Sequence, residues 1–114
     1  MISNNLFSLK GKTALVTGGS TGIGLMATVG LVSAGAKVFI VSRKLENCQN
    51  AAKELNNYGF EGEVIPFRGD LSSEAGINNI TDEIYSKNSK LHILINNAGR
   101  TWGSDFSSFP YDAW

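Results

Sequence analysis

The hydrophobic positions of this chain follow two alternating patterns. Short apolar runs rich in β-branched residues, typical of buried parallel strands, alternate with segments in which apolar residues recur every three or four positions, as on one face of a helix. The predicted strands span residues 12–17, 37–41, 63–67 and 91–95. The predicted helices span residues 22–34, 45–55 and 77–84. The pattern therefore predicts the element order β-α-β-α-β-α-β.

Turn and capping residues indicate where the helices begin and end. Gly35 and Gly59 follow the first two helices and can end them. Ser42 can cap the start of the second helix, and Ser72 or Ser73 can cap the third. Residues 96–114 are expected to form a loop that leads into the first turn of another helix.

Strands that alternate with helices predict an α/β fold of the doubly wound Rossmann type. Right-handed crossovers then give a parallel sheet with helices on both faces. We expect the strand order 3-2-1-4. A ligand crevice is expected at the carboxyl ends of the strands, between the first and the fourth. Residues 1–114 are interpreted as one truncated, partial dinucleotide-binding domain.

Composition excludes several classes of partner. The 114 residues carry ten basic and ten acidic side chains, and the longest basic cluster is Arg43-Lys44, so no nucleic-acid partner is expected. A single Cys48 excludes an internal disulfide and fits a reducing compartment; its place on the apolar stripe of a helix indicates a core residue. No run is apolar and long enough to span a membrane. We expect a cytoplasmic protein without a metal site, in which His92 is a packed or edge residue.

A glycine-rich turn between the first strand and the first helix is the main candidate for chemistry. Its residues are Gly18, Gly19, Ser20, Thr21, Gly22, Ile23 and Gly24. Glycines allow a tight turn whose N–H groups approach phosphate oxygens, and the helix N-terminus adds a partial positive charge. A tight connection without a ligand is the alternative. A nucleoside-triphosphatase loop is excluded because Leu25 occupies the position of its lysine, and residues 42–44 lack the acidic residue expected of a methyltransferase.

Three signatures, each at the end of a predicted strand, resemble those of the short-chain dehydrogenase/reductase family. Gly18-x-x-x-Gly22-x-Gly24 is similar to the family's cofactor loop. Asp70-Leu71 follows the third strand, and Asn96-Asn97-Ala98-Gly99 follows the fourth. The resemblance extends to the 3-oxoacyl-[acyl-carrier-protein] reductase-like branch and covers about the first half of a family member.

The end of the second strand predicts NADP(H) as the cofactor. An acidic residue there would bind the 2′-hydroxyl of NAD and repel a 2′-phosphate. Arg43 can instead bind a phosphate with two hydrogen bonds, Lys44 adds charge, and Ser20 and Ser42 offer hydroxyls. A solvated Arg43 at a helix start is the alternative.

The resemblance also implies roles for individual residues. Residues 18–21 line the phosphates and ribose, and Ile23 lies beneath the diphosphate. Asp70 accepts from the adenine amino group, with Leu71 alongside the ring; a helix cap is the alternative role for Asp70. Asn97 contacts the ribose side, Gly99 allows close approach of the cofactor, and Ala98 between them is also assigned to cofactor binding. Asn96 ties neighbouring strands together.

The family's catalytic Tyr-x-x-x-Lys is absent from these residues. Tyr58 is followed four positions later by Gly62, and Tyr85 by Ser89. No catalytic residue is therefore assigned in this chain. The resemblance implies an N-terminal fragment of an NADP(H)-dependent oxidoreductase that transfers hydride to or from a carbonyl or secondary alcohol, the parent being a homo-oligomer. A non-catalytic, truncated nucleotide-binding or interaction module is the alternative.

Overall fold

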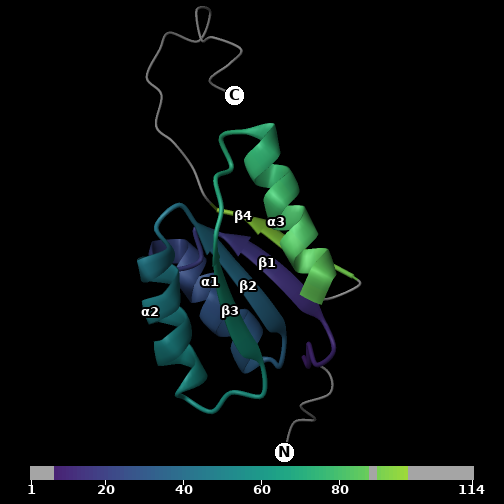
Figure 1. The fold of residues 1–114 in the computed structure, drawn as a ribbon. Coiled ribbons are helices and arrows are strands. Elements are labelled where there is room, and N and C mark those ends of the chain that lie inside the picture. Colours follow the sequence, from purple (N-terminus) through teal and green to yellow (C-terminus); the bar gives the residue numbers. More distant parts are fainter. Residues whose placement is uncertain (1–6, 88–89, 98–114) are drawn as a thin grey trace, which may run out of the picture.

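A computed structural model describes residues 7–87 and 90–97 of the chain (Figure 1). The strands are β1 (Thr13–Thr17), β2 (Lys37–Ser42), β3 (Glu63–Arg68) and β4 (Ile93–Asn96). The helices are α1 (Gly22–Ser33), α2 (Leu45–Asn56) and α3 (Glu74–Lys87). The strands are all parallel, in the order β3-β2-β1-β4. The predicted Rossmann-like fold and strand order are confirmed.

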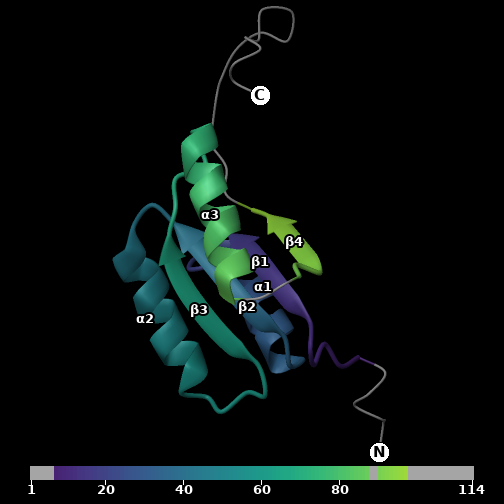
Figure 2. The same ribbon diagram turned by 45° about the vertical axis from the view of Figure 1, so that its right-hand side comes forward.

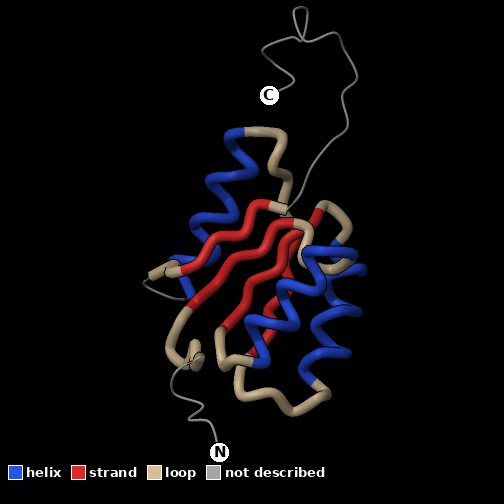
Figure 3. Tube along the Cα trace, turned by 180° about the vertical axis from the view of Figure 1, so that it is seen from behind, coloured by secondary structure: helices blue, strands red, loops and turns tan. Residues whose placement is uncertain are grey.

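Helices cover both faces of the sheet. Figure 2 shows α3 in front of the sheet, and the view from behind in Figure 3 shows the two other helices, α1 and α2, on the opposite face. Parallel crossovers place successive helices in this way because each connection must return across the sheet with the same hand. The carboxyl ends of the strands consequently share one edge, where Thr17 is in register with Val41 of β2 and Asn96 of β4.

Alternating side chains of the central strands build a core on each face. Ala14 and Val16 of β1 pack with Val38 and Ile40 of β2 beneath α1 and α2, where Cys48 is also buried. The predicted core position of Cys48 is confirmed.

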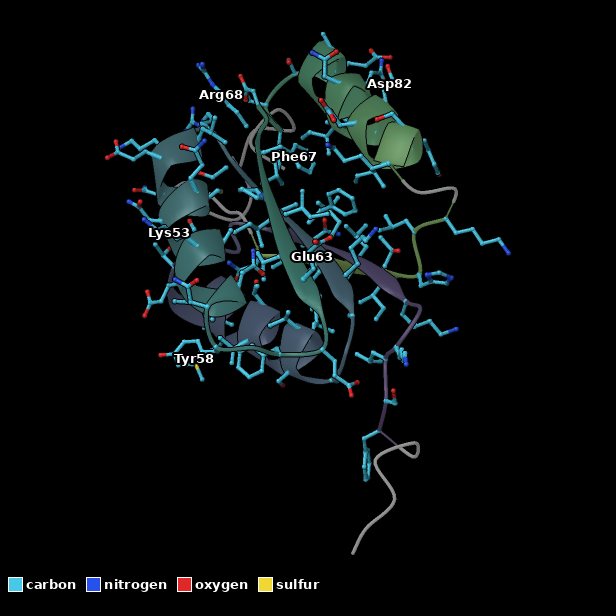
Figure 4. The ribbon with its side chains drawn as sticks, turned by 60° about the horizontal axis from the view of Figure 1, so that its bottom comes forward. Lys53, Tyr58, Glu63, Phe67, Arg68 and Asp82 are labelled. Atoms are coloured by element: carbon cyan, nitrogen blue, oxygen red, sulfur yellow. The ribbon has the colours of Figure 1, made fainter. Side chains whose placement is uncertain are left out.

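The opposite face is covered by α3. Leu15 and Phe39 pack there with Ile80 and Ile84 of α3. Phe67 joins them, with its ring centroid 5.8 Å from that of Phe39 in an edge-to-face arrangement; Figure 4 shows Phe67 between β3 and α3. Even-numbered positions of β1 and β2 are therefore buried on one face of the sheet and odd-numbered positions on the other, as expected because side chains alternate along a strand.

The capping role predicted for Ser42 is wrong. Ser42 is the last residue of β2, where it pairs in register with Arg68. The N-cap of α2 is Lys44, whose side chain makes no cap bond; its backbone N–H donates to the Ser42 hydroxyl oxygen at 3.2 Å. Ser73 does cap α3, because its hydroxyl oxygen accepts from the Gly76 N–H at 3.0 Å. Strand pairing thus extends β2 by one residue beyond the predicted end.

The fourth strand begins two residues later than predicted. His92 lies just before it and is tied to the amino end of β1 by two hydrogen bonds. Its backbone N–H donates to the Thr13 carbonyl at 2.9 Å, and its ring Nδ1 accepts from the Thr13 N–H at 3.0 Å. His92 is therefore a structural residue at the sheet edge opposite the predicted crevice.

Replacing Phe39 should test the core beneath α3. Phe39→Ala removes a fully buried ring, so the free energy of unfolding should fall by about 3–5 kcal/mol in urea denaturation. Met26→Ala, on the exposed side of α1, is the control and should change it by less than about 0.5 kcal/mol. Equal losses in the two variants would contradict the assigned core.

Candidate functional site

The loops that follow the strands converge at the carboxyl edge of the sheet. In Figure 1 the arrowheads of β1 and β4 lie side by side at this edge. The turn of residues 18–21 follows β1, Arg43 follows β2, Asp70 follows β3 and Asn97 follows β4. The structure therefore brings to one edge the segments for which the sequence predicted a common site.

The turn between β1 and α1 needs glycine at some positions for backbone conformation and at others for space. Gly18 has a φ of 67°, in the left-handed region. A Cβ on Gly24 would overlap the Gly18 carbonyl oxygen and lie 2.6 Å from Asn97 Nδ2. The first turn of α1 thus packs directly against the backbone that precedes it, and the close contact explains the glycine.

Three carbonyl oxygens of this turn are bound by the protein itself. The Gly18 oxygen accepts from Asn97 Nδ2 at 3.3 Å, and the Gly19 oxygen accepts from the Thr28 hydroxyl at 3.2 Å. The Thr21 oxygen accepts from the Leu25 N–H at 3.1 Å. In a trans peptide the N–H points opposite to the carbonyl, and the described residues contain no cis peptide. The N–H groups of residues 19, 20 and 22 therefore point away from these partners.

The N-terminus of α1 carries no compensating negative group. Thr21, its N-cap, makes no side-chain cap bond, and the first turn of α1 contains no acidic residue. By contrast, α2 and α3 carry Glu46 and Glu74 in their first turns. The positive end of the α1 dipole and its unbonded N–H groups are thus left for a ligand. Ile23 lies beside them with 76% of its surface exposed.

Asn97 and Thr17 fasten the end of β4 to this turn. The Thr17 hydroxyl oxygen accepts from the Asn97 N–H at 2.9 Å and donates its hydrogen to the Ile95 carbonyl at 3.3 Å. Sequence reasoning gave the strand-tying role to Asn96, but the side chain that reaches across to β1 is that of Asn97; Asn96 pairs with Thr17 through the sheet register. The role of Thr17 was missed, because contacts between residues 80 positions apart leave no local signal.

Arg43 and Asp70 lie near each other at the ends of β2 and β3, and both are exposed. Hydrogen bonds from the Ser72 hydroxyl, at 2.6 Å, and from the Ser72 N–H, at 2.9 Å, lower the pKa of Asp70, and the positive charge of Arg43 lowers it further. Asp70 therefore forms a local turn with Ser72, while the helix-cap alternative belongs to Ser73. The carboxylate stays ionised and beside a cation.

A buried thiol connects the turn after β1 to the end of β2. The side chains of Ser20 and Ser42 both hydrogen-bond Cys48, which is fully buried. Burial raises the pKa of the Cys48 thiol, and the two hydroxyls oppose this shift only in part, so the group is neutral. Sequence reasoning placed Cys48 in the core but missed this contact with two predicted site residues.

Two hollows flank the site without enclosing it. A groove of about 470 Å³ between α1 and α2 reaches Ser20 and Thr21 at one end but is not lined by Gly22 or Asp70. A smaller, more apolar one of about 290 Å³ lies on the other face, between α3 and the strands β1 and β4, and includes Leu71. The loops gathered at the carboxyl edge and the bound carbonyls of the turn after β1, rather than the larger hollow, therefore mark the candidate site.

Three further expectations from the sequence concern the residues after Asn97, metal binding and membrane-spanning helices. Ala98, Gly99 and the rest of the predicted loop through residue 114 fall outside the described residues. Within residues 7–87 and 90–97, no cluster of three or more His, Cys, Asp and Glu side chains could hold a metal ion. In the same part of the chain, none of the helices has the length and apolar character needed to cross a membrane.

Comparison with known proteins assigns this arrangement to a family. A family model described as short chain dehydrogenase matches residues 12–114. The chain is 47% identical over 108 residues to a rhamnolipids biosynthesis 3-oxoacyl-[acyl-carrier-protein] reductase of Pseudomonas aeruginosa, a match that covers 95% of this chain and 41% of that protein. It is 42% identical over 88 residues to human dehydrogenase/reductase SDR family member 11, covering 77% of this chain and 34% of that protein.

Solved structures give the same result. A Pseudomonas aeruginosa RhlG/NADP active-site complex is 46% identical and superposes with a TM-score of 0.76, over 95% of this chain and 41% of the other. L-Sorbose reductase from Gluconobacter frateurii, complexed with NADPH and L-sorbose, is 28% identical with a TM-score of 0.81, with the same two shares covered. The chain thus spans about two fifths of the length of these relatives.

Two glycine substitutions on one helix should separate close packing from helix propensity. Gly24→Ala places a methyl group against the Gly18 carbonyl, so the free energy of unfolding should fall by about 1–3 kcal/mol. Gly30→Ala is the matched control because a Cβ there meets open space; it should raise the free energy of unfolding by up to about 1 kcal/mol. Chemical denaturation measures both. Equal stability of the two variants would refute the close contact at Gly24.

Proposed function

The chain belongs to the short-chain dehydrogenase/reductase family, and from that premise we propose that it forms the NADP(H)-binding part of an oxidoreductase. In the whole protein, hydride is transferred between the nicotinamide and a carbonyl or secondary alcohol. The observation that carries this proposal is the turn after β1, whose carbonyl oxygens are bound by the protein while its N–H groups point the other way. A backbone arranged in this manner suits a diphosphate.

The described residues fit the two halves of such a cofactor. The N–H groups of residues 19–22 and the uncapped start of α1 bind the diphosphate, above the exposed Ile23. Asp70 and Leu71 take the adenine side, and Asn97 takes the ribose side. Ala98 and Gly99, which lie outside the described residues, are proposed to continue the site there. The cofactor itself supplies or accepts the hydride; the protein holds it and directs the ring toward the substrate.

The end of β2 favours NADP(H) over NAD(H). No acidic residue stands there to bind a free 2′-hydroxyl, and Arg43 provides a planar cation that can hold a phosphate with two hydrogen bonds. Lys44 adds a second exposed charge, and the hydroxyls of Ser20 and Ser42 meet at Cys48 beneath the same region. Two structures similar to this chain are described as complexes with NADP and NADPH, which supports this choice.

Proton transfer is assigned to residues that this chain does not contain. In the family a tyrosine donates the proton and a lysine four positions later lowers its pKa, and no Tyr-x-x-x-Lys occurs in these 114 residues. The second candidate function is a nucleotide-binding or interaction module without catalysis, which would use the same turn after β1. An assay that follows NADPH oxidation with a panel of ketones and aldehydes separates the two, because a module binds NADPH without consuming it.

The remaining elements of the proposal follow from the same family. The partners are the dinucleotide and a small carbonyl or alcohol substrate, in a homo-oligomer. A cytoplasmic location is proposed because the described cysteine, Cys48, is a free buried thiol, which fits a reducing compartment.

Charge reversal at Arg43 should change the cofactor preference. Arg43→Asp removes the phosphate partner and adds a repelling carboxylate, so affinity for NADPH should fall about 10- to 100-fold while affinity for NADH is kept or rises. Titration of each cofactor by the fluorescence of its nicotinamide measures the ratio.

Lys53→Asp is the matched control because it reverses the same charge on the same face of the sheet. Lys53 is exposed in the last turn of α2, far along the helix from its start at Leu45 (Figure 4). This variant should leave both affinities within about two-fold of the wild type. An unchanged ratio of NADPH to NADH affinity in Arg43→Asp would remove Arg43 from the site.

A further inference from the structure

Thr28 places a buried hydroxyl group inside α1. The residue is fully buried within a mainly apolar helix. Its hydroxyl lies 2.9 Å from the Gly24 carbonyl oxygen, one helical turn earlier, and 3.2 Å from the Gly19 carbonyl oxygen. The first contact is the usual bond of a helical threonine. The second contact reaches out of the helix to the turn that precedes it, so the single hydroxyl hydrogen is shared between two carbonyl oxygens.

The Gly19 backbone is confined between β2 and α1. A Cβ at this position would lie 2.6 Å from Cγ2 of Ile40 and 2.9 Å from the Thr28 hydroxyl oxygen. Gly19 is itself buried, so its carbonyl has to find a partner within the protein, and Thr28 is the donor that the structure supplies. The two contacts fix both the position and the orientation of this peptide.

Orientation of the peptide determines where the next N–H group points. The Gly19 carbonyl and the Ser20 N–H belong to one planar trans peptide and point in opposite directions. With the carbonyl directed into α1, the Ser20 N–H is directed away from the helix interior. A carbonyl that lost its partner would rotate toward another donor, and the N–H would rotate with it.

We propose that Thr28 is a positioning residue of the diphosphate site, whose hydroxyl holds the Gly19–Ser20 peptide with its N–H presented to the ligand. The inference rests on the proposed binding of a dinucleotide by the turn after β1. It assigns part of the affinity to a side chain that does not touch the cofactor. The decisive property is the hydroxyl rather than the size of the side chain, since a carbonyl left buried without a donor is costly.

Three substitutions at Thr28 distinguish the effect of the hydroxyl group from the effect of side-chain volume. Thr28→Val keeps the shape and removes the donor, Thr28→Ala removes the donor with less bulk, and Thr28→Ser keeps the donor. The variants are made in the whole protein, and circular dichroism checks that each one folds. Calorimetry then measures binding of NADP⁺, NAD⁺ and adenosine 2′-monophosphate, which has the 2′-phosphate but neither phosphate of the diphosphate.

The proposal gives a specific pattern of affinities. Thr28→Val and Thr28→Ala should each weaken NADP⁺ and NAD⁺ about 3- to 10-fold, as for the loss of one neutral hydrogen bond. Binding of adenosine 2′-monophosphate should stay within about two-fold, and Thr28→Ser should bind all three ligands within about two-fold of the wild type. Thr81→Val is the matched control, since Thr81 makes the same one-turn bond on α3, to the Ile77 carbonyl at 3.0 Å, away from the turn; it should change none of the affinities.

Several results would overturn the proposal. Unchanged dinucleotide affinity in Thr28→Val or Thr28→Ala would show that the hydroxyl does not matter, as would an equal loss in Thr28→Ser. An equal loss for adenosine 2′-monophosphate would show general damage rather than a misdirected N–H. If Thr28→Val does not fold, the comparison of Thr28→Ala with Thr28→Ser decides. A wild-type protein that binds neither dinucleotide removes the proposed function, and the inference with it.

Discussion

A backbone turn can offer its amide hydrogens to an anion only when its carbonyl oxygens are bound elsewhere. In this protein three such oxygens are held by three different parts of the fold. The Gly18 oxygen is held by the end of β4, the Gly19 oxygen by the interior of α1, and the Thr21 oxygen by the first turn of α1. Because Asn97 reaches Gly18 only when β4 lies beside β1, the strand order β3-β2-β1-β4 is a condition for the site as well as for the core.

Two regions at the carboxyl edge of the sheet differ in the groups that could bind a ligand. The diphosphate region depends on backbone N–H groups and on a helix start without acidic residues, and it needs no charged side chain. The region at the ends of β2 and β3 depends on side chains, with Arg43 near Asp70 and with two serine hydroxyls meeting at the buried Cys48. On the proposed function, substitutions in one region are therefore expected to affect binding of any dinucleotide, and substitutions in the other to affect the choice between NADP(H) and NAD(H).

The spacing of apolar residues predicted the fold because each strand and each helix leaves its own pattern in a short stretch of sequence. The apolar runs predicted the strands, the three-and-four spacing predicted the helices, and the Rossmann type then predicted the strand order. The errors have the opposite origin. Ser42 was assigned to a helix cap because nothing local shows that pairing with Arg68 extends β2. The links from Thr17 to Asn97 and from Thr28 to Gly19 also escaped prediction, since a threonine in an apolar segment is compatible with many environments.

The most direct test of this account is the response of the backbone amides to NADP⁺ in a ¹⁵N-labelled sample of the whole protein. The account predicts that the largest chemical-shift changes fall on residues 19–24, where the N–H groups are directed away from the bound carbonyls, with smaller changes near Arg43 and Asp70. Amides at the opposite edge of the sheet, such as that of His92, should not move. Saturable binding with unshifted amides in residues 19–24, or with changes centred on the edge that contains His92, would contradict it.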